Sequence, residues 1–145
     1  MKEKIQGALE LVNGGLKFRA ESGSNTPILL DYPDGNESCE GYSAQQLVLL
    51  GLADCCATTV TRLLRESGRT VDGLSVKVTG LRDEEEPWPL KKIFLNFTVD
   101  STNASWSDML KAFSLAEQSC CPVWGMLKGN VEVQTQFSLR LPMAV

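Results

Sequence analysis

Alternating hydrophobic and polar residues near the start of the chain predict three β-strands. Residues 4–12 and 16–21 form two such runs, separated by the turn Asn13-Gly14-Gly15. An Asn-Gly pair between strands favours a tight hairpin, because both residues tolerate a positive φ. A third short strand is expected over residues 28–30, so the chain should begin as a three-stranded meander.

The pattern then becomes helical over residues 43–67. Apolar residues recur at steps of three and four, and the first half of the segment is apolar on nearly every side. Such a helix is typical of a protein interior. We expect it to be central and buried. One small sheet would not cover it, so we also expect a second subunit to pack against it in a homodimer.

Alternation returns in two segments, residues 74–81 and 93–99, which predict antiparallel strands joined by an acidic loop. A second helix should begin near Ser105, because Ser105 and Asp108 have the spacing of a capping box. This helix is expected to run to about Ser119.

Pro122 suits the first turn of a short third helix that continues over residues 123–128. Residues 131–141 predict a last strand. The order β-β-β-α-β-β-α-α-β indicates an α+β fold with antiparallel β-sheets around a long buried central helix. A length of 145 residues fits a single domain over residues 1–145.

Composition narrows the classes of function. The net charge is -4, with Lys and Arg scattered along the chain, which argues against nucleic acid as a partner. The first residues contain no apolar signal region, and we find no stretch approaching the 18 or so apolar residues of a membrane span. We therefore expect a cytoplasmic protein that has no membrane partner.

The cysteines are the candidate functional residues of this chain. The chain has five cysteines and no histidine, and four of the cysteines form the adjacent pairs Cys55-Cys56 and Cys120-Cys121. A reducing compartment favours free thiols over structural disulfides. Adjacent cysteines lack the gap of two to four residues seen in zinc knuckles, so neither a metal nor another cofactor is expected.

The cysteines differ in expected reactivity because they occupy different positions in the predicted helices. If Pro122 is the first helical residue, Cys121 is the N-cap, where unpaired N–H groups favour a thiolate. Cys55 lies in mid-helix among leucines, where burial should raise its pKa. For any single cysteine, the alternative is a small buried apolar residue without chemistry. Cys56 and Cys120 are expected to have no catalytic role, and Cys39 is expected to be a loop thiol.

Asp54 is the carboxylate nearest to these thiols in sequence. In so apolar a segment it needs a partner or a wet cleft. An ion pair with Arg62 or Arg82, or a bond to a nearby hydroxyl, is the preferred interpretation; a catalytic acid is the alternative.

Two motifs resemble the OsmC/Ohr family. Residues 43–55, SAQQLVLLGLADC, are similar to the family pattern S-P-x-E-L-L-x-x-A-x-x-x-C. Residues 116–123, AEQSCCPV, are similar to A-E-x-x-x-C-P-V. The resemblance implies an intertwined homodimer of OsmC-like fold whose cysteines face each other near the subunit interface.

The resemblance also implies a thiol peroxidase that acts on organic hydroperoxides in oxidative-stress defence. Cys55 would be the peroxidatic thiol, which becomes a sulfenic acid. Cys121 would be the resolving thiol, which condenses with it to a disulfide that a dithiol reductant reopens.

The chain departs from the family at the charges that activate the peroxidatic thiol. Leu16 follows the Gly-Gly pair where the hydroperoxide reductases have an arginine, and Gln45 and Gln46 stand where a glutamate would be. Arg19 is the candidate substitute. Two alternatives therefore stay open: a non-catalytic dimer that binds a small apolar or sulfur-containing ligand, and a redox sensor without turnover.

Overall fold

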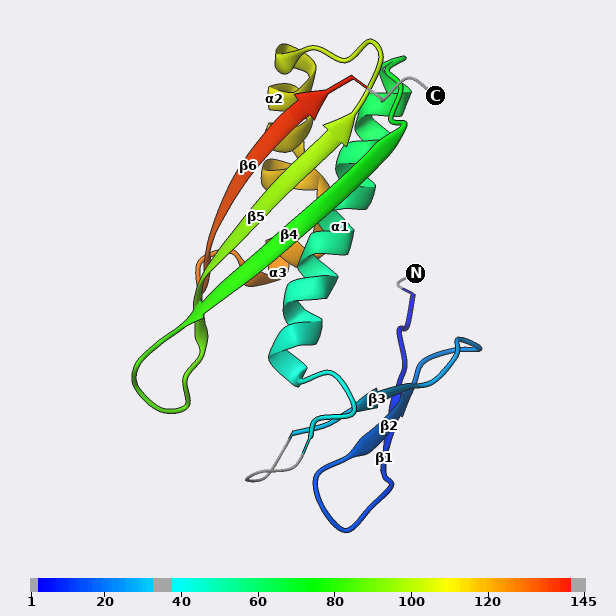
Figure 1. Cartoon of the computed structure of the whole chain (residues 1–145), viewed down its shortest axis with the longest axis vertical. Coiled ribbons are helices and arrows are strands. Elements are labelled where there is room, and N and C mark those ends of the chain that lie inside the picture. The colour runs from blue at the N-terminus through cyan, green and yellow to red at the C-terminus, as the bar shows by residue number, and fades with distance from the viewer. Residues whose placement is uncertain (1–2, 33–37, 142–145) are drawn as a thin grey trace. The chain divides into compact units, whose positions relative to one another are not determined.

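The computed structural model describes residues 3–32 and 38–141. It divides into two compact units, Met1–Leu47 and Val48–Val145, each described here by itself. The elements follow the order expected from the sequence (Figure 1). Their bounds are β1 Ala8–Leu11, β2 Phe18–Glu21, β3 Ile28–Leu30, α1 Ala44–Glu66, β4 Gly73–Arg82, β5 Leu90–Asp100, α2 Trp106–Leu115, the π-helix η1 Ala116–Cys120, α3 Pro122–Leu127 and β6 Glu132–Arg140.

The first unit contains the antiparallel sheet β1-β2-β3. The tight Asn-Gly hairpin predicted between β1 and β2 is wrong. Instead, Val12 N–H donates to Lys17 O over 3.0 Å, and Asn13 Oδ1 accepts from the N–H groups of Gly15 and Lys17. The Asn13 side chain thus closes a longer loop, and neither glycine of the turn has a positive φ.

The second unit contains the sheet β4-β5-β6. β4 and β5 are antiparallel, as expected, but β5 and β6 are parallel, with Lys92 opposite Glu132 and Asp100 opposite Arg140. The prediction of wholly antiparallel sheets was therefore wrong for one pair. The cause is that α2, η1 and α3 form a crossover between β5 and β6, and such a connection returns the chain in the same direction.

The helices lie on one side of this sheet (Figure 1). The buried stripe of α1 recurs every four residues, and alternate residues of β5 face it. The core consists mainly of Leu52, Cys56, Val60 and Leu64 from α1, Ile93, Leu95, Phe97 and Val99 from β5, and Met109, Ala112, Phe113, Cys121 and Trp124 from the crossover.

Gly80 on β4 lies against the side chains of Leu49 on α1 and Leu90 on β5. A Cβ at this position would lie 2.9 Å from Leu49 Cδ2 and 2.7 Å from Leu90 Cδ2, so no larger residue fits without movement.

One side of α1 is partly exposed in the single chain. Val48 and Leu50 are 39% and 45% exposed, and Gly51 is exposed as well. The sheet of the single chain therefore leaves part of α1 uncovered, as expected for a helix too apolar for one small sheet to cover. Its apolar residues point to two sides, but the sheet covers only one of them.

The expectation that no segment is long and apolar enough for a membrane span is wrong for α1. By length and composition alone, Ala44–Glu66 is apolar enough to cross a membrane. This is weak evidence, because a core helix meets the same criteria. Within the second unit, α1 contributes six buried residues, from Leu52 to Leu64, to a packed interior, as a core helix does.

Capping explains where the helices begin. Ser43 and Gln46 form a reciprocal capping box at α1, with bonds of 2.9 Å and 3.1 Å. Ser105 and Asp108 form the expected box at α2. The second helix is shorter than predicted, because after Leu115 the chain widens into η1, whose end is marked by Cys121 N–H donating to Ala116 O.

Candidate functional site

Three thiols converge where α1 meets the start of α3. Cys56 Sγ lies 3.7 Å from Cys121 Sγ, and the Cys121 thiol also interacts with Cys55. All three cysteines are free thiols, since a disulfide brings two sulfurs to about 2.05 Å. Cys56 and Cys121 are buried, whereas Cys55 is half-buried.

Local structure explains this convergence. Cys56 belongs to the buried stripe of α1, between Leu52 and Val60. Cys55 is one residue away and therefore lies at the edge of that stripe, where partial exposure is expected. On the other side, Cys121 is the N-cap of α3 with Pro122 at the first helical position, as predicted, and the widened turn of η1 leads directly into it. Single π-turns of this kind often occur at functional sites.

The environment keeps Cys55 mainly protonated. Burial raises its pKa, and the neighbouring Cys121 thiol raises it further. A backbone hydrogen bond from Val123 opposes this shift, because it stabilises the thiolate. The Asp54 carboxylate adds a small upward contribution. The sequence-based expectation of a raised Cys55 pKa is therefore confirmed.

Cys56 is held more strongly as a neutral thiol. Burial raises its pKa far above the ordinary range, and Cys121 and Cys55 raise it further. Unlike Cys55, Cys56 has no contribution that lowers its pKa. Of the two adjacent thiols on α1, Cys55 thus has the better-stabilised anion.

The four candidate supporting residues do not form one group. Gln46 caps α1 through Ser43, so its side chain has a structural role. Arg19 is exposed on β2 and pairs with Glu21. Gln45 is half-buried in the first turn of α1. Asp54 is exposed, and within residues 3–32 and 38–141 it makes no ion pair, so the expected pair with Arg62 or Arg82 is wrong.

Cys56 was expected to have no catalytic role, yet its sulfur lies in contact with the sulfur of Cys121. The periodicity of four residues through Leu52, Cys56 and Val60 was the signal that placed it on the buried face. Cys120 is half-buried, with its sulfur 3.6 Å from Ser119 Oγ. Cys39 is exposed and donates to the backbone carbonyls of Asp31 and Gly41.

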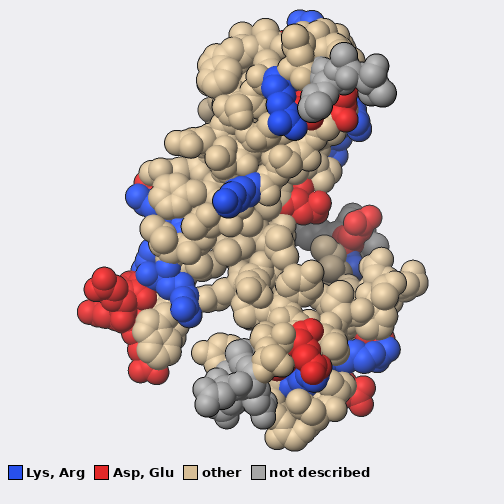
Figure 2. Space-filling view, viewed as in Figure 1, with Lys and Arg blue, Asp and Glu red and all other residues tan. Residues whose placement is uncertain are grey.

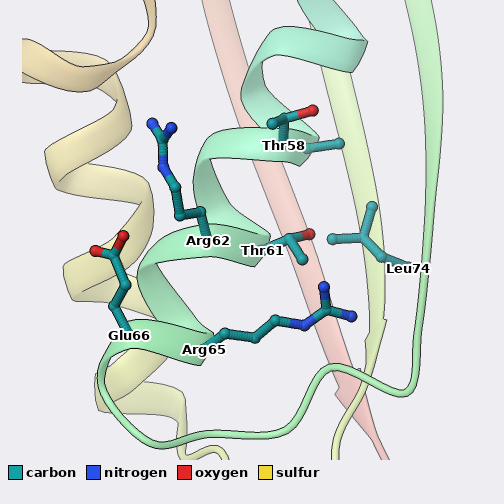
Figure 3. Close-up of a pocket in the computed structure, with 7 residues that line it drawn as sticks. Thr58, Thr61, Arg62, Arg65, Glu66 and Leu74 are labelled. Atoms are coloured by element: carbon teal, nitrogen blue, oxygen red, sulfur yellow. The ribbon is translucent and has the colours of Figure 1, made fainter.

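A separate pocket of about 680 Å³ lies further along α1, and none of its lining residues is a cysteine. Figure 3 shows Thr58, Thr61 and Arg65 on the side of α1 that faces Leu74, whereas Glu66 points away. Arg65 is held by a bond to the Val71 carbonyl. Two of the pocket's lining residues, Ala57 and Thr58, directly follow Cys56 on α1.

Charged side chains of both signs are mixed on the visible surface of the protein (Figure 2). On the face shown in Figure 2, Lys and Arg are interspersed with Asp and Glu and do not gather into a broad basic surface. Across the described ranges 3–32 and 38–141, no three His, Cys, Asp or Glu side chains form a group that could hold a metal ion.

Solved structures share this fold over nearly the whole chain. An OsmC-like protein from Mycoplasma pneumoniae is 22% identical, with a TM-score of 0.82 over 97% of this chain and 99% of that one. A hypothetical protein from Aquifex aeolicus is 18% identical, with a TM-score of 0.85 over 98% and 100%. An organic hydroperoxide resistance protein OsmC from Legionella pneumophila is 17% identical, with a TM-score of 0.72 over 94% and 97%.

A search of curated proteins gave no match. The family model described as OsmC-like protein matches residues 35–136, a span that contains both cysteine motifs and the elements that bring them together. The α+β fold, the two motifs and this match agree, and the chain belongs to the OsmC-like protein family.

Proposed function

We propose that this protein is a thiol-dependent hydroperoxide reductase in which Cys55 is the peroxidatic thiol and Cys121 the resolving thiol. The observation that carries the proposal is the convergence of Cys121 on the α1 cysteines, next to a backbone N–H that stabilises the Cys55 thiolate. The similar solved structures include organic hydroperoxide resistance proteins from Legionella pneumophila and Bacillus subtilis.

The chemistry follows from the two thiols. The Cys55 thiolate attacks one oxygen of the O–O bond, which breaks and releases an alkoxide that takes a proton to become an alcohol. Cys55 becomes a sulfenic acid. The Cys121 thiol then attacks the Cys55 sulfur, a disulfide forms and water leaves. A dithiol reductant returns both thiols by exchange, so the cycle needs no metal or other cofactor.

Activation by Val123 fits the absence of the family's charges. Leu16, Gln45 and Gln46 provide no ion pair, and Arg19 is paired with Glu21. The Val123 N–H stabilises the Cys55 thiolate without a charged partner. One hydrogen bond compensates less than a cation would, so we expect slow turnover. The apolar neighbours of the site favour an organic hydroperoxide over hydrogen peroxide.

The proposal includes a cytoplasmic homodimer in which residues 1–145 form one OsmC-like domain. Val48 and Leu50 support the dimer, because a second α1 would cover the apolar side that the sheet leaves exposed. The cytoplasm supplies the reducing environment and the dithiols that the cycle requires.

One observation favours a second candidate, a non-catalytic dimer that binds a small apolar or sulfur-containing ligand. The causes that set the Cys55 pKa include no cation, and together they raise it. A thiol of this kind reacts slowly at neutral pH. A binding protein would show no loss of thiols when treated with hydroperoxide.

Steady-state consumption of tert-butyl hydroperoxide with dithiothreitol separates these candidates. We expect Cys55→Ser to lower turnover by at least about 100-fold, because the substitution removes the sulfur that attacks the hydroperoxide. Cys120→Ser is the matched control and should retain turnover. Full turnover in the Cys55→Ser protein would exclude the proposed mechanism, and no turnover in the unaltered protein would favour the binding candidate.

A further inference from the structure

Cys56 is a third thiol at the site, and the two-cysteine cycle does not use it. Its sulfur is in van der Waals contact with Cys121 Sγ, 3.7 Å away. Both side chains are almost fully enclosed, at 1% and 5% exposure. Cys121 therefore lies between two potential disulfide partners, Cys55 and Cys56.

We propose that Cys56 is a second resolving thiol. It displaces Cys55 from the Cys55–Cys121 disulfide, and the released Cys55 thiol can react with a second hydroperoxide. This inference rests on the proposed function, because the Cys55–Cys121 disulfide is its starting point. The product is a buried Cys56–Cys121 disulfide beside a free Cys55.

The exchange step balances without any further reactant. The Cys56 sulfur attacks the Cys121 sulfur and forms a new S–S bond, while the Cys55–Cys121 bond breaks and its electron pair leaves on Cys55. The proton of the Cys56 thiol is transferred to the Cys55 thiolate. One thiol and one disulfide are present before and after the step, so nothing is oxidised or reduced overall.

The direction of exchange follows from the leaving group. A disulfide releases its more acidic thiol more readily. Val123 lowers the Cys55 pKa by a hydrogen bond, whereas nothing opposes the effect of burial on Cys56. Cys55 is thus the better leaving group. At equilibrium the less acidic Cys56 should remain in the disulfide.

Two other disulfides, Cys55–Cys56 and Cys120–Cys121, are not expected to compete with the Cys56–Cys121 disulfide. Cys55 and Cys56 are adjacent on one helix, so their side chains diverge and a disulfide between them would be strained. Cys120 is adjacent to Cys121, its sulfur lies near Ser119 Oγ at 3.6 Å, and it is half-buried. Cys56 is thus the expected disulfide partner of Cys121 after the exchange.

The number of hydroperoxide equivalents consumed without reductant tests the relay. In a Cys39→Ser background, which removes the exposed loop thiol, the protein should consume about two equivalents per chain, and Cys56→Ala about one. In the first protein, the second equivalent leaves a sulfenic acid on Cys55 that dimedone labels when added after the first equivalent is spent. In Cys56→Ala, Cys55 is locked in the disulfide and is not labelled. Cys120→Ala, the matched cysteine control, should behave like the background protein.

Tandem mass spectrometry of the background protein gives an independent readout that does not depend on a variant. Fragmentation between residues 55 and 56 identifies the cysteine that is joined to Cys121. A Cys56–Cys121 disulfide after one equivalent supports the relay. Uptake of about one equivalent with a lasting Cys55–Cys121 disulfide overturns the relay but leaves the peroxidase intact. No uptake at all overturns the proposed function itself.

Discussion

The backbone N–H of Val123, at the start of α3, lowers the pKa of Cys55, in the middle of α1. Pro122 has no N–H to offer, so Val123 provides the first available donor of the helix. The bond partly offsets the rise in pKa that burial imposes on Cys55. In the proposed mechanism, this interaction takes the place of a charged pair in activating Cys55.

The reactivity of Cys55 should therefore increase with pH well beyond neutrality. Because its pKa is raised above the ordinary 9.0, the thiolate is a minor species at neutral pH and grows as the pH rises. The rate of Cys55 alkylation by iodoacetamide, followed by peptide mass analysis, should still be rising at pH 9. A plateau near about pH 7 would contradict this account of the site.

Asp54→Asn should make Cys55 more reactive. The Asp54 carboxylate contributes to the raised pKa of Cys55, and its removal favours the thiolate. Asp54 is exposed and solvent screens its charge, so the expected gain in alkylation rate at neutral pH is only about twofold and should shrink with added salt. Glu66→Gln, further along α1, is the control. A slower reaction in Asp54→Asn would mean that Asp54 assists the chemistry.

Gln46→Ala should weaken folding but leave the thiols unchanged. Gln46 and Ser43 form the capping box of α1, and loss of such a cap costs about 0.5–2 kcal/mol. Urea denaturation measures this cost, and Ser43→Ala should give a similar one. A specific loss of hydroperoxide consumption in Gln46→Ala, with unchanged stability, would instead assign Gln46 to the site.

Leu50→Asp should dissociate the proposed dimer without unfolding the chain. Leu50 is 45% exposed on the side of α1 that the sheet does not cover, so a charge there is tolerated in the monomer but not in an apolar interface. Sedimentation velocity should show a dimer for the unaltered protein and a monomer for Leu50→Asp. Leu110→Asp, at a residue 53% exposed on α2, should remain dimeric. The interface would be contradicted if Leu110→Asp were monomeric as well, or if Leu50→Asp remained dimeric.

Local signals predicted most of the second unit. The capping box at Ser105, the proline at the start of α3 and the alternation in β4 and β5 depend on neighbouring residues, and the structure confirms them. The parallel pairing of β6 with β5 was not predictable in this way, because it depends on how the crossover returns over the sheet.

The candidate site was predictable only in part. The family motifs indicated Cys55 and Cys121, and the structure brings both motifs together. The contact between Cys56 and Cys121 depends on the depth at which α1 packs and on the widened turn of η1, which the sequence pattern did not reveal. The Val123 hydrogen bond comes from the backbone, so no side-chain motif could indicate it.

The most direct test of the central claim is a single-turnover measurement of organic hydroperoxide consumption without reductant. The account predicts that Cys121→Ser still consumes hydroperoxide and accumulates a sulfenic acid on Cys55, because only resolution is lost. Cys55→Ser should consume none on the same timescale. Rapid consumption by Cys55→Ser, with the sulfenic acid on Cys121 or Cys56, would contradict the assignment of Cys55 as the peroxidatic thiol.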